Sequence, residues 1–529
     1  MADDHDGQAT RNQKPHRMRI GIVAAGLLTL TLAVPARAAP DQQPNPDLVA
    51  RGKYLADAGD CLACHTKPGG EPYAGARYLP TPFGPLSTPN ITPDKETGIG
   101  NWTDDQFYRA LHEGVGADGA YLYPAMPYPW YTKVTRDDVL AIKAYLFTLK
   151  PVHSPRLPNQ MAFPFNIRTG LLAWDEAFFK AGTFKPDPRQ SAEVNRGAYL
   201  VQGLGHCGAC HNGHGTLGNG SVAEPLRGGP IQDWYAPNLT SDVHEGIGKY
   251  SDAQLVSYLK TGQADGMGAA AGPMSETIHD SLSKLTDADL HAMVAYLKST
   301  HAEPSYQAAE RSDYTGAQPA GRETYLNFCV SCHQPNGQGI KGAVAPLGGN
   351  GSVLARGPQD VIRAVLGGIE AVGPEAPMPA VGAGMSDRQV ADVTNYIRQA
   401  WGNKAPPNAG PGTVAHLRKS TVKVNYGGNA GPCPPVEPPA IATAVSDPNI
   451  KDALQNTNAA NVLQSVEQIL PKVKSAAPQA QQADIVNGLT LAYCPVVRQD
   501  KSIPEPQKVT QLDQFSERVY SELKSNGKE

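Results

Sequence analysis

The sequence has no long apolar run beyond Val34 and no excess of positive charge. A membrane-spanning helix needs roughly 20 consecutive apolar residues, so any membrane contact of the later chain is expected to be peripheral. The 46 Lys and Arg against 50 Asp and Glu give a net charge of −4, which argues against nucleic acid as a partner. Aromatic residues make up only 7%, against 54 Gly and 47 Pro, so we expect a mainly α protein with short helices, long loops and little sheet.

The first 38 residues have the arrangement of a secretory signal. Basic residues precede an apolar run at residues 20–34, and the small-residue segment Ala36-Arg37-Ala38 follows it. The alternative is an uncleaved membrane anchor, but this run is shorter than the roughly 18 to 20 residues that span a bilayer. We therefore predict cleavage after Ala38 and export of the mature chain. Removal of five basic and three acidic residues leaves 41 − 47, a net charge of −6.

Six of the eight cysteines occur in three copies of a Cys-x-x-Cys-His pentapeptide. Two thiols three residues apart can each add to one vinyl group of haem, and the next residue, a histidine, then lies under the iron as its proximal ligand. One copy alone would also suit a thioredoxin-like redox pair or half of a zinc site. Three copies, none paired with a second Cys-x-x-Cys at zinc spacing, favour three covalently bound haem c groups. The predicted residues are Cys61, Cys64 and His65 (site 1), Cys207, Cys210 and His211 (site 2), and Cys329, Cys332 and His333 (site 3).

The pentapeptides head a longer repeat. Arg-Gly-x-Tyr-Leu precedes the first two copies, and residues 321–326 are a tighter version before the third. Asn90-Ile91-Thr92 and Asn238-Leu239-Thr240 then stand at equivalent places; they match the glycosylation sequon, but their fixed position inside a repeat favours a loop role. Each unit is predicted to end in a helix with a cap-like start. These helices are expected at residues 135–147, 285–298 and 386–398.

The ligand on the other face of each iron decides whether a haem reacts or only conducts electrons. Met126 lies thirty-six residues after Asn90, and Met274 lies thirty-six after Asn238, so the two methionines are predicted to do the same job. Met378 precedes the last helix of the third unit in the same way. The rival candidates, Met267 and Met385, do not keep these positions, and no histidine recurs at one place in all three units. We therefore predict the iron-ligand pairs His65 with Met126, His211 with Met274, and His333 with Met378.

Further segments carry a resemblance to a known family. They include residues 98–103, Tyr123-Pro124-Ala125-Met126-Pro127-Tyr128, residues 234–239 and residues 395–403. From about Asp47 to Asn403 the chain resembles the triple-haem cytochrome c subunit of bacterial membrane-bound dehydrogenases that oxidise alcohols, aldehydes, gluconate or polyols. The resemblance implies electron transfer from a separate catalytic subunit to ubiquinone at the periplasmic face of the cytoplasmic membrane, with peripheral attachment to that membrane. It implies a catalytic partner of the pyrroloquinoline quinone, molybdopterin or flavin type, and the same six iron ligands.

The expected architecture is three tandem cytochrome c-like haem domains, a Pro- and Gly-rich linker and a small helical C-terminal region. The predicted boundaries are a signal peptide at 1–38, haem domains at 39–185, 186–308 and 309–405, an extended linker at 406–446 and helices at 447–529. The amphipathic C-terminal helices either cover the haem domains or form a docking surface. Cys433 and Cys494 are expected to form a disulfide in an oxidising compartment, with two free thiols as the alternative.

Three functions remain open at this point. The first is an electron-transfer subunit without substrate chemistry of its own. The second is a catalytic multihaem enzyme of the peroxidase or nitrite reductase type, which needs an iron with an open position. The third is a haem subunit of a terminal oxidase, which is disfavoured because no transmembrane helix accompanies the haem motifs.

Overall fold

In the computed structural model, residues 45–529 form one compact unit. The structure describes residues 45–523 except 221–222, 308–318, 371–376, 422–435, 437–438, 481, 504–507, 509–510, 513, 517 and 520–521. The predicted signal peptide therefore lies outside the described residues. No helix in this described part combines the length and apolarity needed to cross a membrane.

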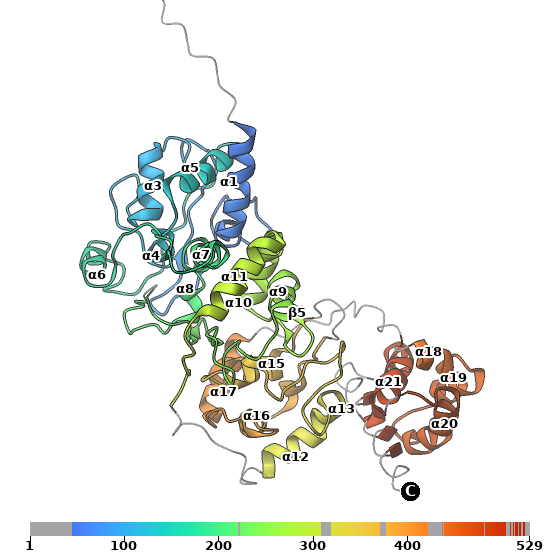
Figure 1. Ribbon diagram of the computed structural model, residues 1–529. Helices are drawn as coiled ribbons and strands as arrows, with labels where there is room; N and C mark the ends of the chain where they lie inside the picture. Colours follow the sequence, from blue (N-terminus) through green and yellow to red (C-terminus); the bar gives the residue numbers. More distant parts are fainter. Residues whose placement is uncertain are drawn as a thin grey trace, which may run out of the picture. The chain divides into compact units, whose positions relative to one another are not determined.

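Three successive segments share one helical frame, in which the first helix crosses the last (Figure 1). We call them repeats 1, 2 and 3. The crossing pairs are α1 (Pro46–Ala58) with α5 (Arg136–Leu146), α7 (Ala192–Tyr199) with α11 (Asp287–Ser299), and α12 (Pro319–Phe328) with α16 (Asp387–Gln399). Glycine is required at each crossing, because a Cβ on Gly52 would lie 1.8 Å from the carbonyl oxygen of Ala141. Gly197 and Gly321 approach the partner helix backbone in the same way.

Short helices and two-stranded ribbons fill the space between the crossing helices (Figure 1). Repeat 1 contains α2 (Cys61–Cys64), β1 (Tyr78–Leu79), β2 (Leu86–Ser87), α3 (Asp104–His112) and α4 (Tyr128–Tyr131). Repeat 2 contains η1 (Leu200–Leu204), α8 (Gly208–His211), β3 (Gly229–Ile231), β4 (Trp234–Ala236), α9 (Asp252–Thr261), β5 (Gln263–Ala264), β6 (Gly268–Ala269), α10 (Pro273–Asp280) and η2 (Leu282–Lys284). Repeat 3 contains α13 (Val330–His333), α14 (Gly351–Leu354), α15 (Gln359–Gly367) and η4 (Val381–Gly384). The three ribbons are antiparallel, and α6 (Gly170–Phe178) lies between repeats 1 and 2 in the chain.

Helix caps place the last helix of each repeat where the sequence predicts it. The hydroxyls of Thr135 and Thr286 accept from the backbone N–H of the third residue of α5 and α11. Ser386 and Gln389 form a complete capping box at the start of α16. The observed starts agree with the predicted starts to within two residues, because the cap is a local signal.

A π-helical turn in repeat 2 absorbs one additional residue. Cys61 follows Gly52 by nine positions, whereas Cys207 follows Gly197 by ten. The π-helix η1 directly follows α7 and widens one turn of the backbone. The extra residue therefore leaves both the glycine crossing and the attachment helix of repeat 2 in place.

The buried apolar residues form one cluster shared by repeats 1 and 2 and separate clusters in repeat 3. Buried residues of repeats 1 and 2 belong to a single continuous cluster that includes Leu55, Ile142, Leu204 and Leu290. Repeat 3 has its own two clusters. Repeats 1 and 2 therefore share one core.

The segment 406–446 differs from the extended linker that was predicted. It contains α17 (Pro411–Ser420) and the start of a further helical group. Gly410 and Pro411 begin α17, because proline is well suited to the first turn of a helix, and Val414 and Leu417 bury their side chains in the core of repeat 3. The Pro- and Gly-rich composition therefore marked a helix start and not only a linker.

The C-terminal helices form a core of their own. They are α18 (Pro439–Val445), α19 (Pro448–Gln455), α20 (Val462–Ala476) and α21 (Gln482–Gln499). Their apolar side chains, with Phe515 and Val519, pack against one another. The apolar residues of this cluster therefore bury one another, and the two roles expected for these helices, covering the haem domains or forming a docking surface, stay predictions. Cys494 on α21 is disulfide-bonded, and its expected partner Cys433 lies outside the described residues.

Candidate functional site

The histidines of the three pentapeptides are oriented in the same way. Nδ1 of His65 lies 2.8 Å from the carbonyl oxygen of Pro89, and Nδ1 of His211 lies 2.7 Å from that of Pro237. Nδ1 of His333 lies 3.0 Å from the carbonyl oxygen of Ala345. A carbonyl can only accept, so Nδ1 carries the proton and donates, which leaves the lone pair of Nε2 for a metal ion. Burial lowers the pKa of all three histidines, which favours the neutral, ligating form.

The cysteines lie beside these histidines on one-turn helices. α2, α8 and α13 begin at or next to the first cysteine of each pentapeptide. Burial raises the pKa of Cys61, Cys64 and Cys207 to about 12 and that of Cys210 to about 11. Each one-turn helix thus brings two cysteine thiols and one histidine nitrogen together at one place. The donor set therefore fits covalent thioether attachment of haem with an axial histidine nitrogen.

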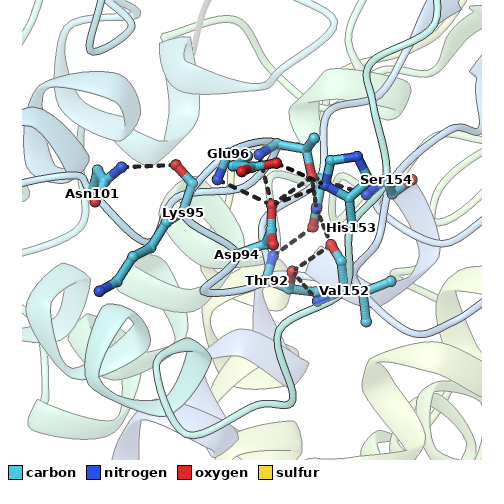
Figure 2. A network of polar contacts seen from close by, with 10 residues as sticks. Thr92, Asp94, Lys95, Glu96, Asn101, Val152, His153 and Ser154 are labelled. Carbon is cyan, nitrogen blue, oxygen red and sulfur yellow. Dashed lines mark hydrogen bonds and ion pairs between the residues drawn. The ribbon is translucent and has the colours of Figure 1, made fainter.

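A polar network holds the loop that presents the carbonyl of Pro89. The side-chain amide of Asn90 donates to the carbonyl of Val152 at 2.7 Å, and the backbone N–H of Thr92 donates to Oδ1 of Asn90 at 2.9 Å. The carboxylate of Asp94 accepts from both the backbone N–H and the hydroxyl of Thr97 at 2.7 Å. Figure 2 shows this loop fastened to the segment that leaves repeat 1. The network fixes the acceptor that orients His65.

Repeat 2 builds the same network with different partners. The amide of Asn238 donates to the carbonyl of Glu303 at 2.7 Å and to Ser305, and its Oδ1 accepts from the backbone N–H of Thr240. Asn90 and Asn238 are each only 3% exposed, so the two sequons serve the loop, as predicted. In repeat 3 the equivalent hydrogen bonds come from Asn403, whose side-chain amide donates to the carbonyls of Leu347 and Ile397.

The three predicted distal methionines lie at half-buried positions next to the cores. Met126 precedes α4, and Met274 is the second residue of α10; both pack against the core of repeats 1 and 2. The backbone of Met378 exchanges two 2.9 Å hydrogen bonds with Ile369. Met385 is buried in the core of repeat 3, as expected for a packing residue, and the carbonyl of Met267 accepts from Asn350 of repeat 3. Ligation by the three methionines stays a prediction.

Sites 1 and 2 lie close together. The hydroxyl of Tyr131 on α4 donates to the carbonyl of Gly59 at 2.5 Å, and the Tyr131 ring contacts the ring of His206, next to the attachment helix of site 2. Burial is the main reason why the pKa of Cys64 is raised, and the nearby side chain of Cys210 contributes to the same shift. The attachment residues of the two sites are thus neighbours across the shared core.

Asp60 is an unusual carboxylate between these two sites. It directly precedes Cys61 and has a left-handed φ of 52°. Its Oδ1 is buried and has no hydrogen-bond partner within the described residues. Burial raises the pKa of Asp60 to about 8, with smaller contributions from Asp280 and Glu276, while Lys284 and Arg77 act in the opposite direction.

Two reciprocal contacts between repeats 1 and 2 were missed by sequence reasoning. Asp138 on α5 pairs with Arg51 of its own repeat and accepts from the hydroxyl of Tyr199 of repeat 2. Asp289 on α11 pairs with Arg196 and accepts from the hydroxyl of Tyr54 of repeat 1. The signal that could have found them is the joint presence of Arg-Gly-x-Tyr and Thr-x-x-Asp in two repeats. The third repeat has Glu323 in place of the tyrosine and Gln389 in place of the aspartate, so it lacks both side chains of this contact.

The comparisons with known proteins agree with this geometry. The cytochrome c family matches the chain three times, over residues 49–150, 194–301 and 319–401. The gluconate 2-dehydrogenase cytochrome c subunit of Pantoea cypripedii is 37% identical over 440 residues, which cover 78% of this chain and 98% of that protein. The cytochrome c subunit of alcohol dehydrogenase (quinone) from Gluconobacter oxydans is 36% identical and covers 79% of this chain and 92% of its own length. The fructose dehydrogenase cytochrome subunit of Gluconobacter japonicus is 39% identical, over 67% of this chain and 79% of that protein.

Proposed function

Because this chain belongs to the cytochrome c family, we propose that it is the electron-transfer subunit of a membrane-bound dehydrogenase complex. It carries electrons from a separate catalytic subunit to ubiquinone through three haem c groups. The relatives named as subunits of gluconate, alcohol and fructose dehydrogenases support a sugar acid, an alcohol or a sugar as the substrate of that partner, and an aldehyde is the further candidate. The catalytic subunit holds pyrroloquinoline quinone, a molybdopterin or a flavin.

The observation that carries this proposal is the histidine geometry found three times. Each pentapeptide joins a histidine, whose Nδ1 is fixed by a backbone carbonyl, to two cysteines for thioether attachment. When bound, the haem c groups supply reversible one-electron transfer. The chain positions one nitrogen of each histidine, and Met126, Met274 and Met378 would each supply a thioether sulfur as the second iron ligand when haem is bound. A site closed on both sides conducts electrons and leaves substrate chemistry to the partner.

The contacts between repeats support conduction in series. Sites 1 and 2 share one core, and the contact of Tyr131 with Gly59 lies between them. Repeats 2 and 3 are joined by the backbone N–H of Tyr235, which donates to Asp360 at 2.8 Å, and by the contact of Asn350 with Met267. Rigid contacts of this kind keep the distances between electron carriers constant.

The chain acts at the periplasmic face of the cytoplasmic membrane after export by the signal at residues 1–38.

Purification from membranes without protease treatment is expected to retain a larger dehydrogenase subunit. Haem content by optical assay is expected to be three per chain, and a Cys-to-Ser pair at one site is expected to lower it by one. Substrate-dependent reduction of a ubiquinone analogue by the complex tests the electron route. A preparation that reduces quinone equally well without this chain would overturn the proposal.

The competing function is catalysis at one of the irons. Carbon monoxide binds ferrous haem only where the sixth position is open. We expect no stoichiometric binding to the reduced, folded protein. Binding of one carbon monoxide per chain, together with peroxide or nitrite turnover, would instead assign a catalytic role to that site.

A further inference from the structure

Exposed apolar side chains are concentrated on one segment between repeats 1 and 2. Of the eleven large hydrophobic residues that are exposed in the described part of the chain, five lie between residues 157 and 178. A sixth, Leu217, adjoins them, because its carbonyl accepts from the indole N–H of Trp174 on α6. We call residues 157–178 with Leu217 the apolar segment. Its exposed members are Leu157 (38%), Phe163 (78%), Ile167 (49%), Leu172 (50%), Phe178 (39%) and Leu217 (46%).

The apolar segment is firmly attached to the body of repeat 1. The backbone N–H of Ala162 donates to the carbonyl of Phe83, and the Phe165 ring packs at a tilt against that of Phe83 with centroids 4.2 Å apart. At the other end, the hydroxyl of Tyr128 donates to Oδ1 of Asp175. Figure 1 shows α6 at the edge of the ribbon. The exposed side chains are therefore held in water by a fixed backbone, and such a concentration marks an interaction surface.

The charge of this region differs in sign from that of the whole chain. Residues 150–185, which include both flanks of the apolar segment, contain five Lys and Arg and two Asp and Glu, a net charge of 5 − 2 = +3, whereas the chain has −4. The basic excess lies in the flanks, because residues 157–178 contain one Arg against two acids. The side chains of Arg156 and Lys180, which lie within two residues of Leu157 and Phe178 in the sequence, are exposed, and so is that of Lys185. One of the two acids, Asp175, is buried against Tyr128, and burial raises its pKa. Apolar side chains flanked by basic ones suit a bilayer with anionic headgroups.

We propose that the apolar segment is the membrane-contacting surface of this protein and inserts into the interfacial region of an anionic phospholipid bilayer. This inference rests on the proposed function, which needs a route from the haems to a quinone dissolved in the membrane. The nine-residue helix α6 is too short to span a bilayer, so it lies in the plane of the interface. The C-terminal helices offer no equivalent surface, since their only exposed large hydrophobic residue in the described part of the chain is Leu463.

The attachment of the segment also relates it to site 1. Tyr128, which binds Asp175 and packs against Phe179, follows Met126 by two residues. Docking of the segment therefore brings the loop with the predicted distal ligand of site 1 to the membrane surface.

The test uses the full-length, haem-loaded protein and sedimentation with vesicles. Phosphatidylcholine vesicles with phosphatidylglycerol are compared with vesicles of phosphatidylcholine alone. The variant is Phe163→Ser, Ile167→Ser and Leu172→Ser, and the matched control is Leu48→Ser, Val243→Ser and Leu463→Ser, which removes three exposed hydrophobic residues elsewhere. The haem spectrum and the melting temperature confirm that both variants are folded. We expect binding to the anionic vesicles to fall about tenfold or more in the variant only.

Equal vesicle binding by the variant and the wild-type protein would overturn the proposal. Loss of the dehydrogenase companion with unchanged vesicle binding would also overturn it, because the segment would then contact a protein. The proposed function fails separately. If the variant detaches from vesicles as expected but the wild-type complex transfers no electrons to quinone, the surface is right and the electron route is wrong.

Discussion

The hydroxyl of Tyr199 in repeat 2 donates a hydrogen bond to Asp138 in repeat 1. The reverse contact, from Tyr54 in repeat 1 to Asp289 in repeat 2, has the same chemistry. In both cases the carboxylate also pairs with an arginine of its own repeat and the backbone N–H of the helix-capping threonine lies near the tyrosine oxygen. Repeats 1 and 2 therefore meet as two copies of one subunit meet in a symmetric dimer, although a single chain contains both.

The first prediction concerns these reciprocal hydrogen bonds. Replacement of Tyr199 or Tyr54 by phenylalanine removes a hydrogen bond to a charged acceptor but keeps the ring. We expect each change to lower the free energy of unfolding by about 1 to 3 kcal/mol, measured by denaturant titration followed at the haem absorbance. The control is Tyr78→Phe, whose exposed hydroxyl donates to the carbonyl of Pro158 and is expected to contribute much less. Similar losses in all three variants would show that the tyrosines act only by general packing.

The second prediction concerns the buried arginine of repeat 3. Arg398 is fully buried and donates to the carbonyls of Val353, Gly357 and Pro406, among others. Burial lowers its pKa to about 10, and its cation joins the loop before α15 to the segment after α16. We expect Arg398→Met to lower the free energy of unfolding by about 3 kcal/mol or more, because several carbonyls lose their donor.

The matched control for Arg398 is Arg388→Met. Arg388 lies on the same helix α16, is 78% exposed and pairs with Asp392. An exposed ion pair contributes about 0 to 1 kcal/mol, so the control is expected to stay close to wild type. A tolerant Arg398→Met variant would mean that the loops around site 3 are held by other contacts.

Local signals in the sequence predict much of this fold, but they do not predict contacts between residues that are distant in the chain. Cap pairs such as Ser386 and Gln389 are three residues apart, so the start of a helix is visible without knowledge of the fold. The equal spacing from Asn90 to Met126 and from Asn238 to Met274 is likewise visible in the sequence alone. The pairing of Tyr199 with Asp138 depends on how two repeats face each other, and no local pattern contains that information. Composition misled in one place, since the Gly410-Pro411 pair was interpreted as linker and begins a packed helix.

The third prediction separates the iron-ligating methionines from those that only fill space. Leucine has nearly the volume of methionine but cannot bind iron, so Met→Leu changes leave packing intact. Met126→Leu, Met274→Leu and Met378→Leu are each expected to open one sixth position. Each should then bind one carbon monoxide per chain in the reduced state and lower the midpoint potential of one haem. Met267→Leu and Met385→Leu are the controls and should bind none. If Met267→Leu binds carbon monoxide and Met274→Leu does not, Met267 is the ligand of site 2. The same comparison of Met385→Leu with Met378→Leu decides the ligand of site 3.

The last prediction concerns Asp60, whose carboxyl has a pKa of about 8, raised mainly by burial. Below that pH the group is neutral. Above it, the group carries a negative charge directly before Cys61 and near Cys64 and Cys210, where it favours the more positive, oxidised haems. The midpoint potentials of sites 1 and 2 are therefore expected to fall as the pH rises through about 8, while that of site 3 stays nearly constant. The facing groups Asp280, Glu276, Lys284 and Arg77 set the midpoint of this change.

The variant Asp60→Asn removes the titration and keeps the shape of the side chain. We expect potentials of sites 1 and 2 that no longer change across this pH range and remain near the low-pH values of the wild type. Spectroelectrochemical titration between pH about 6 and 9 measures this change. The exposed Asp265, which pairs with Lys341, supplies the control Asp265→Asn. If Asp60→Asn retains the wild-type pH dependence, another group near the two sites takes up the proton, and the left-handed backbone of Asp60 serves only to turn the chain into the attachment helix.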